Sequence, residues 1–143
     1  MGADHTSGAA IVGRIPRKGK EYGEYTDIEH KLDLSFELQV YTTVLDTMGV
    51  CYFVGPSYEN MSILAKVINA MYDLQLTKDD VINIGVNVLK TEIEFNRKAG
   101  ITQESNDVPA FFKTEASQPL NLKFSFSTDD LRNFWDRLEN YTF

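Results

Sequence analysis

The spacing of apolar residues along this chain predicts a mainly α-helical domain. Beginning at residue 34, apolar side chains recur every three or four positions, a spacing that places them on one face of a helix. Asp33 precedes this series as a candidate N-cap, and Gly49 follows it as a natural helix end. The apolar positions of this first helix are Leu34, Leu38, Tyr41, Leu45 and Met48.

Two further helices are predicted from their capping residues. Ser57 is a candidate N-cap for the second helix, and the acidic turn after Thr77 is related to a capping box that opens a third helix ending at Gly100. The expected buried face of the second helix is Met61, Leu64, Val67 or Ile68, and Met71. The expected buried face of the third is Val81, Ile84 and Val88, with Glu92 and Phe95 following.

The connections are long, so we expect an irregular multi-helix domain with long loops and not a regular bundle. Residues 101–126 contain prolines and alternate weakly between apolar and polar positions, which predicts a short strand or an extended arm. A last helix is expected to open at Ser127 and to run through Leu138. The 143 residues are enough for one domain, 1–143, in which residues 1–32 are mostly loop, with a short helix at 7–12, and residues 33–143 are helical.

Charge and composition exclude several classes of partner. The chain has 14 Lys and Arg against 21 Asp and Glu, a net charge of −7, which argues against nucleic acid as a partner. No apolar run approaches the roughly 18 residues that a membrane span needs. The single cysteine fits a reducing compartment, so we expect a cytoplasmic protein without a membrane partner.

The residues with the most chemical potential lie in the run Asp46-Thr47-Met48-Gly49-Val50-Cys51. A lone cysteine makes neither an intrachain disulfide nor a metal site by itself. Cys51 is therefore either a small buried hydrophobe or one ligand of a site completed by another polypeptide. Asp46 falls at the expected C-terminus of a helix, where the helix dipole disfavours a negative charge, so its carboxylate needs a donor or an arginine as partner.

The remaining candidates have simpler explanations. His5 lies in a glycine-flanked segment and is either an exposed histidine near the N-terminus or a site residue, whereas we assign His30 no role. The acidic pairs at 79–80 and 129–130 fall at expected helix N-termini, where the helix dipole explains them without catalysis. The aromatic residues are expected in the core rather than on a stacking surface, namely Phe111, Phe112, Phe124, Phe126 and Trp135.

Four segments resemble, in the same order, the tungsten- or molybdenum-dependent aldehyde ferredoxin oxidoreductases. The run 46–51 is similar to their Asp-x-x-Gly-Leu-Cys motif, and residues 2–5 resemble the glycine-rich segment that ends in an active-site histidine. Residues 92–102 resemble the signature E-x-x-F-N-x-R-x-G-[FI]-T, and residues 107–112 with 131–141 resemble the C-terminal ending. The resemblance spans nearly the whole chain.

The resemblance implies a fold and a set of ligands. This chain would be the C-terminal helical domain of an enzyme several times longer, whose β-rich N-terminal domain cradles a bis-pterin metal cofactor. Cys51 would be the fourth ligand of a [4Fe-4S] cluster, the other three belonging to a Cys-x-x-Cys-x-x-x-Cys motif in the middle region. Asp46 would accept hydrogen bonds from a pterin, Gly49 would allow close approach, and Val50 would replace the usual leucine beside it.

The resemblance also implies an activity. His5 would lie near the tungsten or molybdenum and assist proton transfer or orient the aldehyde, whereas Ser7 stands where some relatives place a pterin-binding lysine. The full enzyme would oxidise aldehydes to carboxylic acids, pass electrons to ferredoxin, and form a homo-oligomer, and this chain alone would be inactive without the missing N-terminal and middle domains. Two alternatives stay open: a subunit of the related aromatic acyl-coenzyme A reductase type, and a non-catalytic helical interaction module.

Overall fold

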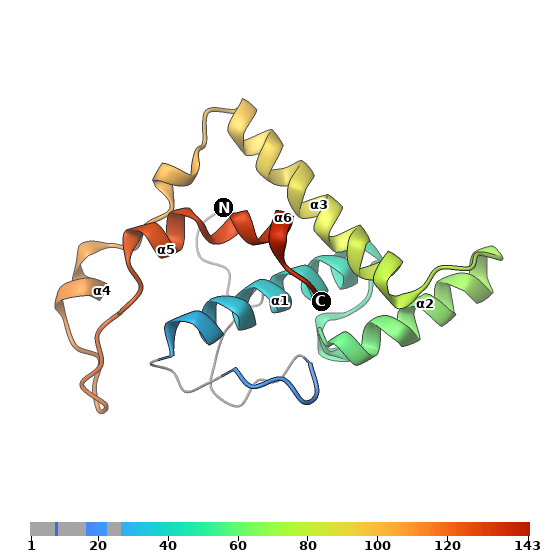
Figure 1. Ribbon diagram of the computed structural model, residues 1–143, viewed down its shortest axis with the longest axis horizontal. Coiled ribbons are helices and arrows are strands. Elements are labelled where there is room, and N and C mark those ends of the chain that lie inside the picture. Colours follow the sequence, from blue (N-terminus) through green and yellow to red (C-terminus); the bar gives the residue numbers. More distant parts are fainter. Residues whose placement is uncertain (1–7, 9–16, 23–26) are drawn as a thin grey trace.

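The protein is a mainly α domain, as the sequence predicts, in which short helices and loops surround one central helix (Figure 1). The computed structural model describes residue 8, residues 17–22 and residues 27–143. Three long helices form the body of the domain: α1 (Ile28–Thr47), α2 (Tyr58–Tyr72) and α3 (Lys78–Lys98). The shorter helices are α4 (Ala110–Thr114), α5 (Thr128–Arg132) and α6 (Arg137–Asn140), with the 3₁₀ helices η1 (Tyr52–Val54), η2 (Gln103–Ser105) and η3 (Phe134–Asp136).

Helix α1 begins earlier than the apolar spacing predicts. Its N-cap is Asp27, whose carboxylate accepts the backbone N–H of His30 at 3.2 Å. This hydrogen bond is the main reason why the pKa of Asp27 is lowered. The predicted N-cap, Asp33, lies inside the helix, where its carboxylate pairs with Arg137 at 3.4 Å. The expected loop therefore ends before residue 28, and the short helix expected at residues 7–12 falls, except for Gly8, outside the described residues.

Helix α1 is buried around most of its circumference, with Ser35, Gln39 and Thr43 on a half-buried stripe, as is typical of a helix at the centre of a domain. Helix α3 crosses it at Gly85, where a Cβ atom would lie only 2.6 Å from the carbonyl oxygen of Val40 and 2.8 Å from Cγ2 of Val44. Only glycine allows the two helices to approach this closely. The buried apolar residues of α1 are Leu32, Leu34, Phe36, Leu38, Val40, Tyr41, Val44 and Leu45, which include four of the five predicted positions.

The predicted caps of α2 and α3 are confirmed. The Ser57 hydroxyl accepts the N–H of Asn60, and Thr77 and Asp80 form a reciprocal capping box. The C-terminus of α3 closes on Gly100, which has a φ of 81°. The acidic turn at residues 79–80 thus opens α3, as expected. The hydrogen bonds that the carboxylate of Asp80 accepts from Thr77 also lower the pKa of Asp80.

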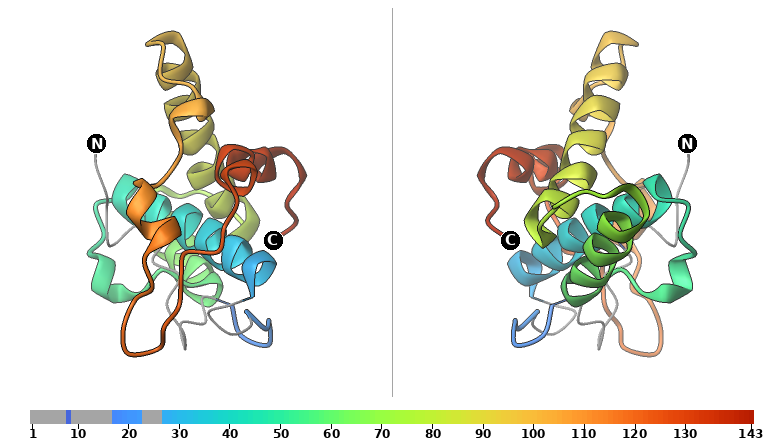
Figure 2. Two further views of the ribbon diagram at one scale, coloured as in Figure 1. Left: turned by 90° about the vertical axis from the view of Figure 1, so that its left-hand side faces the viewer. Right: turned by 90° about the vertical axis from the view of Figure 1, so that its right-hand side faces the viewer.

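The predicted buried faces of these helices are correct only in part. In α2, Met61 and Leu64 are buried, and of the two alternatives Ile68 is half-buried against the core whereas Val67 is exposed. Met71 is exposed as well. In α3 the buried positions are Val81, Ile82, Gly85, Val86 and Leu89, so the core-facing side is rotated relative to the predicted one and Phe95 is exposed. Figure 2 shows the reason for the last difference: the C-terminal half of α3 rises away from the rest of the domain.

The C-terminal third differs most from expectation. No strand forms among the described residues, and residues 101–126 contain instead η2, α4 and one isolated bridge between Ser117 and Leu122. The predicted last helix is divided into α5, η3 and α6, although its start at Ser127 is confirmed by a capping box with Asp130. The neighbouring rings of Phe111 and Phe112 stack on each other in an exposed position and are not part of the core.

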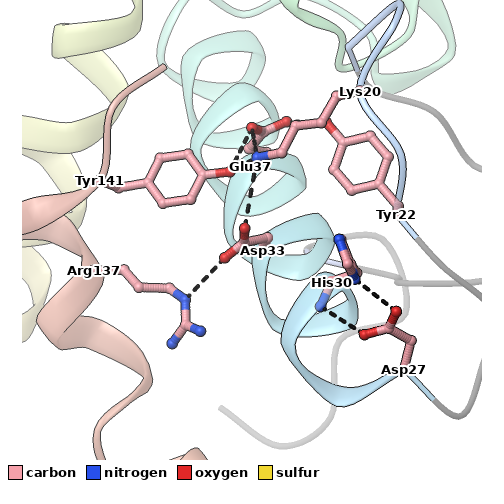
Figure 3. A network of polar contacts seen from close by, with 8 residues as sticks. All are labelled: Lys20, Tyr22, Asp27, His30, Asp33, Glu37, Arg137 and Tyr141. Carbon is pink, nitrogen blue, oxygen red and sulfur yellow. Dashed lines mark hydrogen bonds and ion pairs between the residues drawn. The ribbon is translucent and has the colours of Figure 1, made fainter.

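A buried carboxylate joins α1 to both ends of the described chain (Figure 3). Glu37, in the middle of α1, is fully buried and accepts hydrogen bonds from Lys20 at 2.9 Å, from Tyr141 at 2.6 Å and from the hydroxyl of Tyr22. Lys20 also donates to the hydroxyl of Tyr141. The segment before α1 and the segment after α6 are therefore held on α1 by one charged group.

None of the helices in the described part of the chain is both long enough and apolar enough to cross a membrane.

We expect Glu37→Ala to lower the free energy of unfolding by about 3 kcal/mol, because removing one partner of a buried charged network leaves the others unpaired. Urea denaturation checks this change. Glu139→Ala is the matched control, since Glu139 is exposed and forms only a surface ion pair with Lys90 at 3.1 Å. Equal losses for the two variants would show that the network does not stabilise the fold.

We also expect the domain to lose stability in alkali. Burial, followed by the hydrogen bond to Glu37, raises the pKa of Tyr22 and of Tyr141 well above the usual value near 10. Folding therefore favours the neutral phenols, and this stabilisation is complete below pH 10 and is lost as the pH rises above it. Urea denaturation at increasing pH should show this loss, and Tyr22→Phe should make the slope shallower; an unchanged slope would contradict the assignment.

Candidate functional site

The turn that ends α1 is a Schellman motif, which fixes the backbone of the candidate run. The N–H of Val50 donates to the carbonyl oxygen of Leu45 at 2.9 Å, and the N–H of Gly49 donates to that of Asp46 at 3.1 Å. Gly49 has a φ of 66°, the left-handed conformation that this motif requires. The half-buried side chain of Val50 packs against the core and anchors the turn.

Cys51 follows this turn directly, and its thiol belongs to an exposed residue. It precedes η1, where its carbonyl oxygen accepts the N–H of Val54 at 3.0 Å. The interpretation of Cys51 as a small buried hydrophobe is therefore wrong. The chain presents the sulfur on the surface, between the hydrogen-bonded end of α1 and a short 3₁₀ helix.

Asn60, which the sequence analysis missed, holds the other end of this loop. Its side-chain amide donates to the carbonyl oxygens of Val54 at 3.0 Å and Gly55 at 2.9 Å. The signal in the sequence was its position three residues after the N-cap Ser57, where a side chain can reach back toward the preceding loop. The loop that carries Cys51 is thus fixed at both ends.

An exposed aromatic residue lies next to the thiol. Phe53 is 93% exposed and packs only edge-on against Tyr52, with ring centroids 6.0 Å apart, and Val54 is also exposed. The sequence shows a short apolar segment at residues 52–54 after the helix, but it does not predict that Phe53 and Val54 are exposed. Neighbouring apolar side chains that remain in water are typical of a surface that contacts another molecule.

The carboxylate of Asp46 is exposed at the C-terminus of α1. The last turn of α1 contains no basic residue, and no described side chain forms an ion pair with Asp46. The partner that we expected for this charge is therefore not among the described side chains. Its oxygens are open to a donor from outside the domain.

The structure brings four of the five candidate residues together in one turn, namely Asp46, Gly49, Val50 and Cys51. The fifth, His5, and the neighbouring Ser7 lie outside the described residues, so their place near this turn stays a prediction. Within the described ranges, no group of three or more His, Cys, Asp or Glu side chains could hold a metal ion. Cys51 can therefore contribute one ligand to a site whose remaining ligands come from elsewhere.

A cavity in the described part of the chain lies elsewhere. It has a volume of about 420 Å³ and is bounded by α1 and the C-terminal third, with Leu32, Phe126 and Trp135 in its lining. None of its lining residues belongs to the run 46–51. The candidate site is therefore an exposed turn, separate from this cavity.

Comparison with known proteins gives one match. Residues 1–137 match the family described as "Aldehyde ferredoxin oxidoreductase, domains 2 & 3". No curated protein and no solved structure matches the chain. The match covers the candidate turn, the second and third long helices and nearly all of the C-terminal third.

We expect Asn60→Ala to loosen the loop that carries Cys51, because the carbonyl groups of Val54 and Gly55 lose their donor. The free energy of unfolding should fall by about 1 kcal/mol, and the amide protons of Val54 and Gly55 should exchange faster with solvent, as measured by NMR. Asn87→Ala is the control, because Asn87 is an exposed helical asparagine whose side chain makes no such bond. Unchanged exchange would mean that Asn60 does not hold the loop.

Proposed function

Because this chain belongs to the aldehyde ferredoxin oxidoreductase family, we propose that it is the C-terminal part of an oxidoreductase in which Cys51 binds an iron-sulfur cluster. The observation that carries the proposal is the exposed thiol on a turn fixed at both ends, at the cysteine position of the Asp-x-x-Gly-Val-Cys run. A non-catalytic helical module would be expected to bury its only cysteine, so the exposed thiol favours the redox function.

Cys51 fits the role of a single cluster ligand. A [4Fe-4S] cluster takes four cysteine thiolates, and this chain has one. The other three would come from a Cys-x-x-Cys-x-x-x-Cys segment on the remainder of the enzyme. The exposed neighbours Phe53 and Val54 would then pack against that polypeptide, since burial of apolar surface around a cluster limits the access of water to it.

Asp46 and Gly49 fit the roles of pterin-binding residues. The carboxylate of Asp46 is free of described partners, so its oxygens can accept hydrogen bonds from a ring N–H or amino group. No heavy atom lies within 4 Å of the position that a Cβ of Gly49 would take, so a flat ring could approach the backbone there. One side of Val50 packs against the core, and the rest of its side chain is exposed to solvent beside Gly49.

These residues would hold two redox groups at a constant separation. When bound, a tungsten or molybdenum bis-pterin centre supplies the two-electron oxidation of an aldehyde to a carboxylic acid, and a [4Fe-4S] cluster supplies single-electron transfer to ferredoxin. Asp46 and Cys51 belong to one hydrogen-bonded turn, so the chain orients both groups with the same rigid element. His5 would assist proton transfer or orient the aldehyde.

The test is the iron content of the chain produced together with the polypeptide that carries the Cys-x-x-Cys-x-x-x-Cys segment. We expect Cys51→Ser to lose most of the bound iron and the visible absorption of the cluster, because one of four thiolate ligands is removed. Thr47→Ala is the control, because Thr47 lies on the same exposed helix end and donates only to the carbonyl oxygen of Thr43. Unchanged iron content and absorption in Cys51→Ser would refute the assignment.

A further inference from the structure

The cavity between the first half of α1 and the C-terminal third is not used by the proposed function. Its volume of about 420 Å³ lies within the range of about 300–1,000 Å³ that is typical of small-molecule sites. Aromatic rings pack well against one another, so an aromatic wall favours a ligand that has a ring of its own. The apolar part of the described lining includes Leu32, Leu131, Phe124, Phe126, Phe134 and Trp135.

A second cavity shares Asn106 and Trp135 with the first, so these two half-buried side chains border both cavities. The second cavity has a volume of about 250 Å³ and is more polar, with Asn96 and Arg97 in its lining. The guanidinium of Arg97 already donates two hydrogen bonds of 2.8 Å to Glu94. Asn106 and Trp135 therefore mark the place where a polar group of a ligand in the apolar cavity would lie.

Asn106 and Trp135 offer hydrogen-bond donors that no group in the described part of the chain accepts. The backbone N–H of Asn106 donates to the carbonyl oxygen of Gln103 at 2.9 Å, but its side-chain amide and the indole N–H of Trp135 form no hydrogen bond with a described residue. Ser35 and Gln39, by contrast, are hydrogen-bonded to each other at 3.3 Å. An indole N–H can only donate, and when it is buried it usually has an acceptor. A ligand with a carbonyl oxygen would supply one.

The charged residues in the lining of the apolar cavity disfavour an anionic ligand. The side chain of Lys31 is buried, and its ammonium group donates to the carbonyl oxygen of Tyr22 at 2.9 Å. The carboxylate of Asp107 forms an ion pair with Lys113 at 2.6 Å. A carboxylate in this cavity would therefore lose water without gaining a cation as its partner, and an unpaired charge that leaves water is costly. The lining favours a neutral ligand.

We propose that this cavity binds a small neutral aromatic molecule that carries one carbonyl group. Its rings lie against the aromatic wall, and its carbonyl oxygen accepts a hydrogen bond from the amide of Asn106 or the indole N–H of Trp135. Such a ligand connects α1 with the C-terminal third. The proposal does not depend on the binding of a cluster by Cys51, because the cavity and the turn that carries Cys51 share no described residue.

Titration of the whole chain with methyl β-naphthyl ketone, followed by heteronuclear NMR, tests the proposal. We expect the ketone to shift the signals of the Asn106 side-chain amide and of the indole N–H of Trp135, the chain's only tryptophan, with a dissociation constant below about 1 mM. The comparison ligand is β-naphthoate, which has nearly the same shape but a negative charge. It should bind at least about tenfold more weakly, because the lining offers it no cation.

Asn106→Asp tests the hydrogen bond to the carbonyl group. A carboxylate has nearly the same shape as the amide but cannot donate, so the dissociation constant of the ketone should rise about tenfold. Asn133→Asp is the matched control, because it adds the same charge at an exposed residue that does not line the cavity, and it should leave binding unchanged. The dispersion of the NMR signals verifies that both variants fold.

Three results would overturn the proposal. The first is a Trp135 signal that does not shift at ketone concentrations up to about 1 mM. The second is equal binding of the ketone and β-naphthoate, or equal binding of the ketone by Asn106→Asp and Asn133→Asp. The third is loss of ketone binding when the polypeptide with the other cluster cysteines is present, since the cavity would then be part of the interface with that polypeptide. None of these results changes the iron content by which the role of Cys51 is tested, so the two proposals fail separately.

Discussion

Burial of α1 around most of its circumference is the constraint on which the rest of this structure depends. Helix α3 can approach α1 closely only because Gly85 has no side chain to meet Val40 and Val44. Helix α2 adds Met61 and its neighbours to the same core, and the C-terminal segment covers another side with aromatic rings around Phe36. Because α1 is held along its length, the turn at its end has a fixed place on the surface.

The two halves of α1 are held by different kinds of interaction. In the first half, Glu37 gathers Lys20, Tyr22 and Tyr141 around one buried charge. Such a charge is tolerated only because all of its partners are present, which specifies where the flanking segments lie. At the C-terminus of α1, backbone hydrogen bonds and the side-chain amide of Asn60 fix the loop that carries Cys51, and Cys51 and Phe53 in this loop are exposed to solvent. A hydrogen-bonded backbone and an exposed thiol are thus combined in one loop.

Exposed apolar side chains lie on several surfaces of this domain, two of which flank the candidate site and follow α2. Phe53 and Val54 lie beside the thiol, whereas Ile63, Val67 and Met71 lie exposed on α2. The first surface lies on the loop that carries Cys51, and the second lies on the half of α2 that projects from the body of the domain (Figure 1).

The sequence by itself determined the features that depend on near neighbours in the chain. The N-caps at Ser57, Thr77 and Ser127, the glycine helix ends at Gly49 and Gly100, and the run that ends in Cys51 all follow from interactions within a few residues. The tertiary structure alone decided the features that depend on distant partners: the start of α1 at Ile28, the charged network of Glu37, the division of the last helix, and which apolar face of α2 is buried. Helix α2 has apolar residues on two faces, and its local sequence does not distinguish them. Only the placement of α1 and α3 buries one face and leaves the other in water, just as only the whole fold exposes the thiol of Cys51.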